Sequence, residues 1–326
     1  MKVVITGITG FVGSALAHAL AGEGVELFGV IRPSSNLNRL AHLNVTCFEA
    51  DITVPESLDG LFDWADWVIH AAGMLGEAGV PESAYHHLHV DGMNNVLAEI
   101  EKLDDPPKLL YVSSPGVLGP ITDKPAAETA AHHPSNAYER SKSAAEMLVQ
   151  LYADHGLPVV IARPEFIYGP GDRHVLGLFQ AIQKERFFYI GGGHNLCQPT
   201  FIEDAVEGML GCLRRGRQGQ IYHITGPQPV TFRELGQTIA DTLDVPVPSR
   251  NVPRSLALAG ATIFEAAGGL FKFRPPLSRS GVAFFSEDRQ FDWQKAHREL
   301  AYTPHFDLQT GILKTVEWYR EQGLLF

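Results

Sequence analysis

Cysteine is scarce in this sequence, and positive charge is outnumbered by negative charge. The 326 residues include three cysteines, Cys47, Cys197 and Cys212, which lie far apart and form no Cys-x-x-Cys pair. A disulfide framework or a thiolate zinc site is therefore not expected, and a reducing compartment fits best. Lysine and arginine number 26 against 37 aspartates and glutamates, which gives a formal net charge of −11. A surface of this sign repels phosphate backbones, so nucleic acid is not expected as a partner.

Long apolar runs and targeting segments are also missing. The longest apolar stretch, Leu256–Phe271, is interrupted by Thr262 and Glu265 and is too short to span a membrane. The residues Met1–Gly7 read as a strand that leads into a glycine turn, and they do not resemble a signal peptide. Apolar residues make up 45% of the chain, which supports a large core and excludes disordered and collagen-like classes. We expect a soluble, cytoplasmic protein.

Short apolar runs alternate with helix-period segments through the first half of the chain. This alternation predicts crossover connections and a parallel sheet with helices on both faces, that is, an α/β fold with a doubly wound sheet. The predicted strands are Val3–Ile5, Val25–Ile31, Val45–Glu49, Trp67–His70, Leu109–Ser113 and Pro158–Ala162. The predicted helices are Val12–Ala21, Tyr85–Leu103, Tyr138–His155, Glu203–Leu213 and Thr231–Leu243.

The pattern thins after Arg163-Pro164, where loops rich in glycine and proline follow. A nucleotide-binding domain with a smaller C-terminal α/β part that binds the substrate is the natural division. We place the nucleotide-binding domain at residues 1–170 plus about 195–228, and the substrate-binding part at about 171–194 plus 229–326.

A glycine-rich turn follows the first predicted strand and opens the first predicted helix. Its spacing is Gly-x-x-Gly-x-x-Gly. Such a turn needs close backbone approaches that a Cβ would obstruct, and the free N–H groups at a helix N-terminus bind a pyrophosphate. The sequence therefore predicts a dinucleotide site, although a plain strand–helix turn is the alternative. The residues of this site are Thr6, Gly7, Thr9, Gly10, Phe11, Val12 and Gly13.

The end of the second strand indicates which dinucleotide to expect. A carboxylate usually holds the ribose hydroxyls there, but this strand ends in Arg32, followed by Ser34 and Ser35. These side chains are suited to a 2′-phosphate, which favours NADP over NAD; the alternative is a surface arginine beside a proline turn. At the end of the third strand, Asp51 is a candidate acceptor for the adenine amino group, although acids often begin loops.

Tyr138 and Lys142 are the candidate catalytic pair. Residues at i and i+4 share one helix face, so the Lys142 ammonium is expected to stabilise a Tyr138 phenolate and to lower its pKa. A tyrosine tuned in this way exchanges a proton with a carbonyl or an alcohol. Ser114 follows a predicted strand, at the sheet edge where ligands bind. We expect these three residues to form the catalytic set.

Together these motifs resemble the extended short-chain dehydrogenase/reductase family, the NAD-dependent epimerase/dehydratase superfamily. Further matching segments are Asp51-Ile52, His70–Gly73, Ser113–Val117, Arg163-Pro164, Tyr168–Asp172 and Asp292–Pro304. The resemblance implies a Rossmann-type fold. It also implies that Ser114 binds the substrate oxygen, that Tyr138 is the acid/base, and that Lys142 binds the nicotinamide ribose.

The resemblance extends the predicted cofactor site and implies a homodimer. Its additional residues are Ile52, Ala71, Ala72, Gly73, Tyr138, Lys142, Arg163 and Pro164. The strand end Arg163-Pro164 would pack near the nicotinamide. Relatives often dimerise through the two long helices that correspond here to Tyr85–Leu103 and Tyr138–His155.

Several positions depart from patterns found in the family. Many relatives carry Asn where this chain has His89, which puts an Asn-mediated proton relay in doubt. His86, His87 and His89 invite a metal interpretation, but an ordinary helix turn is favoured and no metal site is predicted. Pro115-Gly116 follow Ser114 where sugar dehydratases of the family carry a pair of acids, which disfavours dehydration.

The branch that the sequence resembles most is that of 3β-hydroxysteroid dehydrogenase and dihydroflavonol reductase. Nucleotide-sugar enzymes generally grip the diphosphate with an Arg at the position of Cys197, and a cysteine cannot replace that clamp. We therefore expect an NADP-preferring oxidoreductase that interconverts a secondary alcohol and a ketone on a largely apolar small molecule. The alternatives are a nucleotide-sugar epimerase with transient NAD reduction and a non-enzymatic NADP-binding sensor.

The apolar segment Pro253–Phe271 has helical periodicity and three possible roles. It is either a buried core helix, a lid over an apolar substrate pocket, or a helix at a membrane surface. Peripheral membrane contact is the least favoured of these.

Overall fold

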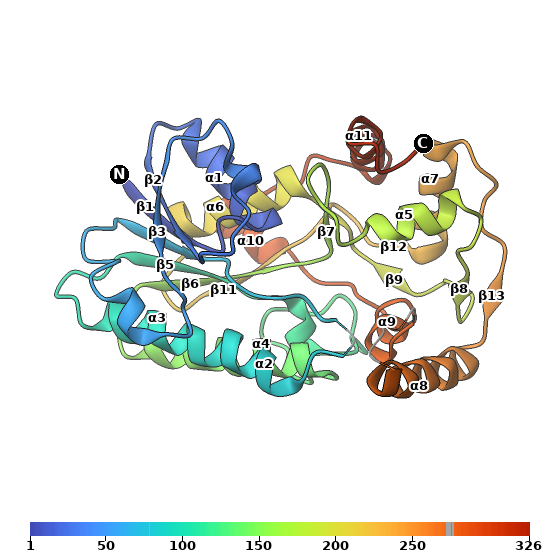
Figure 1. The fold of residues 1–326 in the computed structure, drawn as a ribbon, viewed down its shortest axis with the longest axis horizontal. Helices are drawn as coiled ribbons and strands as arrows, with labels where there is room; N and C mark the ends of the chain where they lie inside the picture. The colour runs from blue at the N-terminus through green and yellow to red at the C-terminus, as the bar shows by residue number, and fades with distance from the viewer. Residues whose placement is uncertain (78, 272–274, 276) are drawn as a thin grey trace.

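The computed structural model describes residues 1–77, 79–271, 275 and 277–326, and it is built around a seven-stranded parallel sheet. Figure 1 shows this sheet in the left half of the molecule. The strand order is β11-β6-β5-β4-β1-β2-β3. The strands are β1 (Lys2–Thr6), β2 (Glu26–Ile31), β3 (Val45–Glu49), β4 (Trp67–His70), β5 (Lys108–Val112), β6 (Val159–Pro164) and β11 (Ile221–Ile224).

Helices cover both faces of the sheet, as the strand–helix alternation predicts (Figure 1). The helices on one face are α1 (Phe11–Ala21), α6 (Ile202–Arg215) and α10 (Gln294–Leu300), and those on the other are α2 (Glu82–His86), α3 (Gly92–Glu101) and α4 (Ala137–Asp154). Because side chains alternate along a strand, Val3 and Ile5 of β1 pack with α1 and α6, whereas Val4 packs on the opposite side with α3. The sheet therefore separates two apolar cores.

The strand order reverses between β1 and β4. From β1 the chain proceeds outward to β2 and β3, and from β4 it proceeds in the opposite direction to β5, β6 and β11. In open α/β sheets, ligands bind at the carboxyl ends of the strands beside such a switch point. All the predicted catalytic and glycine-turn residues lie at this edge.

The six predicted strands are confirmed; two of them have the predicted bounds, and the bounds of the other four differ by at most two residues at either end. The seventh strand, β11, was not predicted, because His223 interrupts its apolar run. The predicted helix Tyr85–Leu103 is interrupted: a π-helical turn, His87–Asp91, separates α2 from α3.

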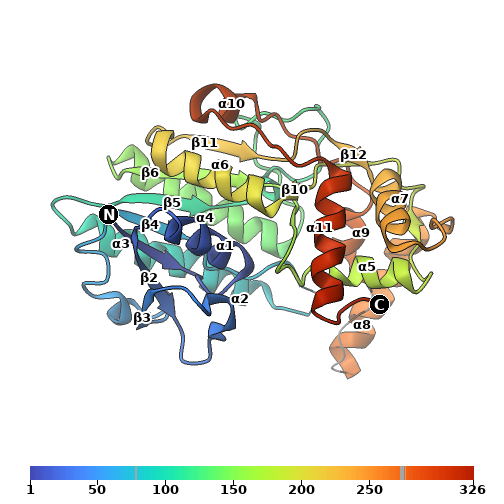
Figure 2. The ribbon, with the colours of Figure 1, turned by 90° about the horizontal axis from the view of Figure 1, so that it is seen from above.

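The rest of the chain forms a smaller lobe, seen on the right of Figure 1. Its paired short strands are β7 (Ile167–Tyr168) with β10 (Thr200–Phe201), β8 (Tyr189–Ile190) with β13 (Asn251–Val252), and β9 (Leu196–Cys197) with β12 (Val230–Thr231). Its helices are α5 (Leu176–Gln183), α7 (Phe232–Leu243), α8 (Arg254–Phe271), α9 (Arg279–Phe284) and α11 (Leu308–Glu321). Figure 2 shows α11 between the sheet and α7, and its buried Ile312 and Val316 join the same core as α1.

Of the three possible roles for Pro253–Phe271, a fully buried core helix does not fit the structure. Helix α8 lies at the edge of the lobe, next to α9 (Figures 1 and 2). Ala257 and Ala261 are buried, but Leu256, Ile263 and Phe271 are 64%, 68% and 72% exposed. A helix with one packed face and one exposed apolar face remains compatible with a lid or with a surface contact. In the part of the chain that the structure describes, no helix is long and apolar enough to cross a membrane.

Candidate active site

The glycine turn after β1 is closed by contacts that leave no room for side chains. Gly7 has φ +71°, and a Cβ on it would lie 2.5 Å from the backbone N of Ala72 in the loop after β4. A Cβ on Gly13 would lie 2.2 Å from the carbonyl O of Gly7. The Gly10 N–H donates to that same carbonyl over 2.9 Å. The turn is thus held tightly against the switch-point loop, and glycine is required at both positions.

The N-terminus of α1 is suited to an anion. Gly10 is its N-cap residue and offers no side-chain cap, and the first turn contains no acidic residue. N–H groups without a capping side chain, at the positive end of a helix, bind phosphate groups well. The glycine turn and this helix end therefore fit the pyrophosphate of a dinucleotide, and Thr9, Phe11 and Val12 line the same turn.

The end of β2 places Arg32 near Asp51. The Arg32 N–H donates to Ser35 Oγ over 3.0 Å, and the Ser35 N–H donates to the Arg32 carbonyl over 2.9 Å, so the two residues form a turn. Arg32 and Ser34 are exposed. The Asp51 carboxylate accepts hydrogen bonds from the backbone and hydroxyl of Thr53. These bonds, with a contribution from the Arg32 charge, lower the pKa of Asp51. Ile52 is buried beneath this strand end.

Ser114 and Tyr138 are brought together at the end of β5. Ser114 caps the short 3-10 turn Pro115–Leu118, where its Oγ accepts the Gly116 N–H over 3.1 Å. Asn136 caps α4 by accepting the Glu139 N–H over 3.0 Å, which places Tyr138 in the first helical turn. Burial raises the pKa of Tyr138, although a hydrogen bond with Ser114 and the positive charge of Arg289 act in the opposite direction. At neutral pH the phenol therefore carries its proton.

Lys142 lies one turn further along α4, buried against β5. Its Nζ donates to the Val112 carbonyl over 2.7 Å and lies 4.5 Å from the centroid of the Tyr111 ring. Burial lowers the pKa of Lys142 to about 8. The prediction that Lys142 lowers the pKa of Tyr138 is wrong. The Lys142 ammonium is bound to the Val112 carbonyl, and burial of the phenol raises the pKa of Tyr138.

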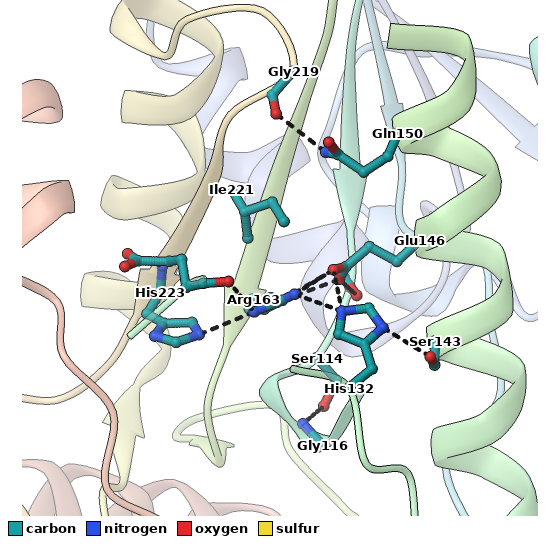
Figure 3. Close-up of polar contacts among 12 residues, drawn as sticks. Ser114, Gly116, His132, Ser143, Glu146, Gln150, Arg163, Gly219, Ile221 and His223 are labelled. Atoms are coloured by element: carbon teal, nitrogen blue, oxygen red, sulfur yellow. Dashed lines mark hydrogen bonds and ion pairs between the residues drawn. The ribbon is translucent and has the colours of Figure 1, made fainter. Parts of the chain in front are cut away.

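Arg163, at the end of β6, faces α4 instead of the sheet edge (Figure 3). Its guanidinium donates to both carboxylate oxygens of Glu146, with Nε 3.1 Å from each and Nη2 2.5 Å from Oε1. Ser113 Oγ donates to the same carboxylate over 2.5 Å. His132 and His223 complete the network, 2.9 and 3.4 Å from Nη2 and Nη1 of the guanidinium.

This network holds the end of the sheet to the catalytic helix. Burial alone would raise the pKa of Glu146, but the hydrogen bond of His132 and the charge of Arg163 outweigh it and bring that pKa to about 2. The Arg163 side chain is only 1% exposed, so its charge is paired with buried groups of the protein and not with solvent. The packing of Arg163-Pro164 against a nicotinamide stays a prediction.

A second buried ion pair, which was not predicted from the sequence, acts on Tyr138. Arg289 donates to Glu165 through Nε (2.7 Å) and Nη2 (2.9 Å), and its Cζ lies 5.5 Å from the Phe284 ring. The pair joins the residue after β6 to a segment 124 residues later in the chain. A single Glu and a single Arg so far apart in the chain form no motif, so their pairing could not be predicted from the sequence.

The three histidines of the interrupted helix do not converge. His86 and His87 are exposed and each approaches Asp91, at 3.3 and 3.1 Å, whereas His89 is buried on the inner face. Within the described residues, no group of three histidine, cysteine or acidic side chains is placed to hold a metal ion.

Relatives by sequence include reductases and dehydrogenases. The 4-hydroxy-2-methyl-3-oxo-4-farnesyl-3,4-dihydroquinoline-1-oxide ketoreductase of Stigmatella aurantiaca is 27% identical over 318 residues, which cover 96% of this chain and 95% of that protein. The 2-alkyl-3-oxoalkanoate reductase of Stenotrophomonas maltophilia is 26% identical, with 96% and 97% covered. The decarboxylating sterol-4-alpha-carboxylate 3-dehydrogenase erg26 of Schizosaccharomyces pombe is 27% identical, with 95% of each covered.

Solved structures share the fold over the full chain. The crystal structure of gox2253 matches with a TM-score of 0.84 at 24% identity, covering 100% of this chain and 99% of that one. The UDP-glucose 4-epimerase of Thermotoga maritima matches with a TM-score of 0.81 at 20% identity, covering 99% of both. The predicted Rossmann-type fold is thereby confirmed.

The match to a family model agrees with the glycine turn, the switch-point edge and the tyrosine–lysine helix. The model of the NAD-dependent epimerase/dehydratase family covers residues 3–225, more than half of the chain. The resemblance inferred from the motifs is confirmed, and the protein is a member of the NAD-dependent epimerase/dehydratase family.

Proposed function

We propose that this protein is an NADP-preferring oxidoreductase that interconverts a secondary alcohol and a ketone on a largely apolar small molecule. The observation that carries the proposal is the placement of Ser114, Tyr138 and Lys142 at the switch-point edge, beside a glycine turn shaped for a pyrophosphate. The relatives that are named as ketoreductase, oxoalkanoate reductase and sterol dehydrogenase support it.

In ketone reduction, the protein's own residues bind the oxygen and deliver the proton. A bound nicotinamide supplies the hydride to the carbonyl carbon. Ser114 Oγ donates a hydrogen bond to the carbonyl oxygen, and Tyr138 Oη transfers its proton to that oxygen as the alcohol forms. Lys142, whose Nζ is held by the Val112 carbonyl, would bind the nicotinamide ribose. Alcohol oxidation reverses each of these transfers.

An apolar substrate is supported by the aromatic side chains next to Arg289, whose charge acts on Tyr138. The Phe166 ring packs edge-to-face on Phe284 with 5.2 Å between centroids, and Phe284 does the same with Phe232 at 5.6 Å. Cys197 is fully buried in β9 and offers no positive charge to a sugar diphosphate. These features favour a hydrophobic ligand over a nucleotide sugar.

The reaction is tested by following reduced-nicotinamide absorbance. Purified protein receives excess NADP or NAD and a panel of sterol-like, aliphatic and flavonoid alcohols, with UDP- and dTDP-sugars in parallel. We expect net accumulation of NADPH with an apolar alcohol. No net reduction with any alcohol, together with conversion of a nucleotide sugar to its epimer, would show that the hydride returns to the same molecule and that the proposal is wrong.

The preference for NADP is assigned to Arg32. Replacing Arg32 by Ala is expected to weaken NADPH binding about 10-fold or more and to leave NADH binding within about twofold, because a charge-assisted hydrogen bond to the 2′-phosphate is lost. Fluorescence titration of both cofactors measures this. The matched control is Arg39→Ala, which also removes an arginine side chain. The Arg39 guanidinium is already bound within the protein, since it donates to the Gly171 carbonyl over 2.5 Å. Equal NADPH affinity in Arg32→Ala and the unchanged protein would refute the assignment.

We further propose a homodimer through α4 and the neighbouring α2–α3 helices. Met147 and Leu151 of α4 are exposed on the surface, at 64% and 50%. They lie four residues apart and therefore on one helix face. A dimer that buries this face would remove both side chains from water.

A further inference from the structure

His89 occupies an unusual position on the helix that faces the active site. It lies in the π-helical turn His87–Asp91, and it is 2% exposed. Its ring packs edge-to-face against Tyr138 with 5.8 Å between centroids. Single π turns inside α-helices are rare and often occur at functional sites. His89 lies four residues after the buried Tyr85 and points inward, while His86 and His87 stay at the surface.

Both ring nitrogens of His89 are engaged, and the partners determine the tautomer. The Met74 N–H points at Nε2 over 3.1 Å. A backbone N–H can only donate, so Nε2 accepts and carries no proton. The proton is therefore on Nδ1, which donates to Ser141 Oγ over 2.8 Å, and Ser141 in turn donates to the Tyr138 carbonyl over 2.7 Å.

These bonds link two segments that both adjoin the reacting groups. Met74 belongs to the loop after β4, whose Ala71 and Ala72 lie against the glycine turn. Tyr138 begins the catalytic helix. The His89 imidazole thus connects the loop after β4 to the first turn of α4, which contains Tyr138.

The residues around His89 and Tyr138 are tightly packed. A Cβ on Gly73 would lie 3.2 Å from His89 Nε2, and one on Gly76 would lie 3.4 Å from the Tyr138 Cβ. Tyr85, four residues before His89, holds the same loop by accepting the Glu77 N–H on its hydroxyl over 2.7 Å. The loop from Ala71 to Glu77, called here the cofactor loop, is therefore fastened at two points to one helical segment.

Burial, with the positive charge of Lys142 nearby, lowers the pKa of His89 to about 3. The ring is neutral at any physiological pH. A relay would require Nε2 to take up a proton, and the Met74 N–H occupies that position.

We propose that His89 is a positioning residue: as a neutral imidazole it fixes the cofactor loop to the Tyr138 turn of α4, and it does not relay protons to Tyr138. The proposal rests on the proposed function for the roles of Tyr138 and of the cofactor loop. In this role His89 supports cofactor binding by accepting the Met74 N–H. A glutamine at position 89 is long enough to accept the same hydrogen bond, whereas a nonpolar side chain cannot.

Three variants separate the two hydrogen bonds. His89→Gln keeps an acceptor near the position of Nε2, His89→Asn keeps a donor near that of Nδ1, and His89→Leu removes both. The affinity for NADPH and NADH is measured by fluorescence titration without substrate, and kcat and KM are measured afterwards. The control is His86→Gln, an exposed histidine one turn earlier, and thermal unfolding checks that each variant folds.

We expect His89→Leu to raise the Kd for the preferred cofactor about 10-fold, since the loss of one well-formed buried hydrogen bond has about this effect. His89→Gln should stay within about threefold of the unchanged protein, and His89→Asn should lie closer to His89→Leu. The solvent isotope effect on kcat should be the same in His89→Gln as in the unchanged protein.

Two results would overturn the proposal. One is an unchanged cofactor Kd in a folded His89→Leu variant. The other is a reduced kcat with an altered solvent isotope effect in His89→Gln at an unchanged cofactor Kd, which would indicate proton relay. Because the Kd is measured without substrate, an error in the proposed reaction would leave this test intact.

Discussion

Replacing Tyr138 by Phe is expected to lower kcat by about 10²- to 10⁴-fold, the range found when a general acid is removed. The ring packing against His89 and Tyr85 is retained in this variant, at 5.8 and 6.2 Å between centroids, so the fold should persist. The Kd for NADPH should stay within about twofold, because the phenol hydroxyl holds the substrate oxygen and not the pyrophosphate. Steady-state kinetics with the best alcohol or ketone and NADPH titration provide the two measurements.

The matched variant is Ser114→Ala, which removes the second hydroxyl at the same oxygen. We expect a smaller loss of kcat, about 10- to 10²-fold, since Ser114 contributes a hydrogen bond and no proton transfer. A doubly substituted protein, Ser114→Ala with Tyr138→Phe, that keeps its activity would exclude both residues from the reaction and would favour a non-enzymatic role.

The second large effect is expected on stability, at the buried pair Arg163–Glu146. Glu146→Gln should lower the free energy of unfolding by about 3–5 kcal/mol at pH 7, because it leaves the Arg163 charge buried and unpaired. Urea unfolding followed by tryptophan fluorescence measures this. Both side chains are 1% exposed, so solvent does not compensate for the loss. The surface pair Arg140–Glu82, with both side chains about half exposed, serves as the control, and its Glu82→Gln variant should change stability by less than about 1 kcal/mol.

The Arg163–Glu146 pair should also make the free energy of unfolding depend on pH in the acid range. The pKa of Glu146 is lowered to about 2 in the folded protein, from an ordinary value of 4.5. Its ionised form therefore contributes stability that is fully present above pH 4.5 and is lost as the pH falls toward 2. The difference in unfolding free energy between the unchanged protein and Glu146→Gln should shrink over this interval. A difference that is constant from pH 7 to pH 3 would show that Glu146 is not held as a carboxylate.

Some parts of this protein were predictable because they depend on short stretches of sequence. The glycine turn is an example: Gly7, Gly10 and Gly13 lie within seven residues, and their spacing reflects a local backbone geometry. The pair Tyr138 and Lys142 is another, since a distance of four residues on a helix fixes a shared face. The strands were found for the same reason, because a buried parallel strand is a continuous apolar run.

Other parts depend on contacts between distant segments. The pairing of Arg289 with Glu165 spans 124 residues, and that of Arg163 with Glu146 needs the register of β6 against α4. The apolar run of β11 is interrupted by His223, so only its pairing with β6 identifies it as a strand. The exposure of α8 followed from its place at the edge of the lobe, since its composition alone fits a buried helix equally well.

His89 is the clearest example of the difference between features that follow from local sequence and features that follow from tertiary contacts. The sequence by itself determined the sheet, the glycine turn and the catalytic tyrosine and lysine, since each rests on local periodicity or spacing. Only the tertiary structure decided that His89 packs against Tyr138, that Met74 and Ser141 fix its tautomer, and that the Lys142 ammonium binds the Val112 carbonyl. These outcomes depend on which groups the fold brings within hydrogen-bond distance, and a hydrogen bond between segments far apart in the chain leaves no periodic pattern in the sequence.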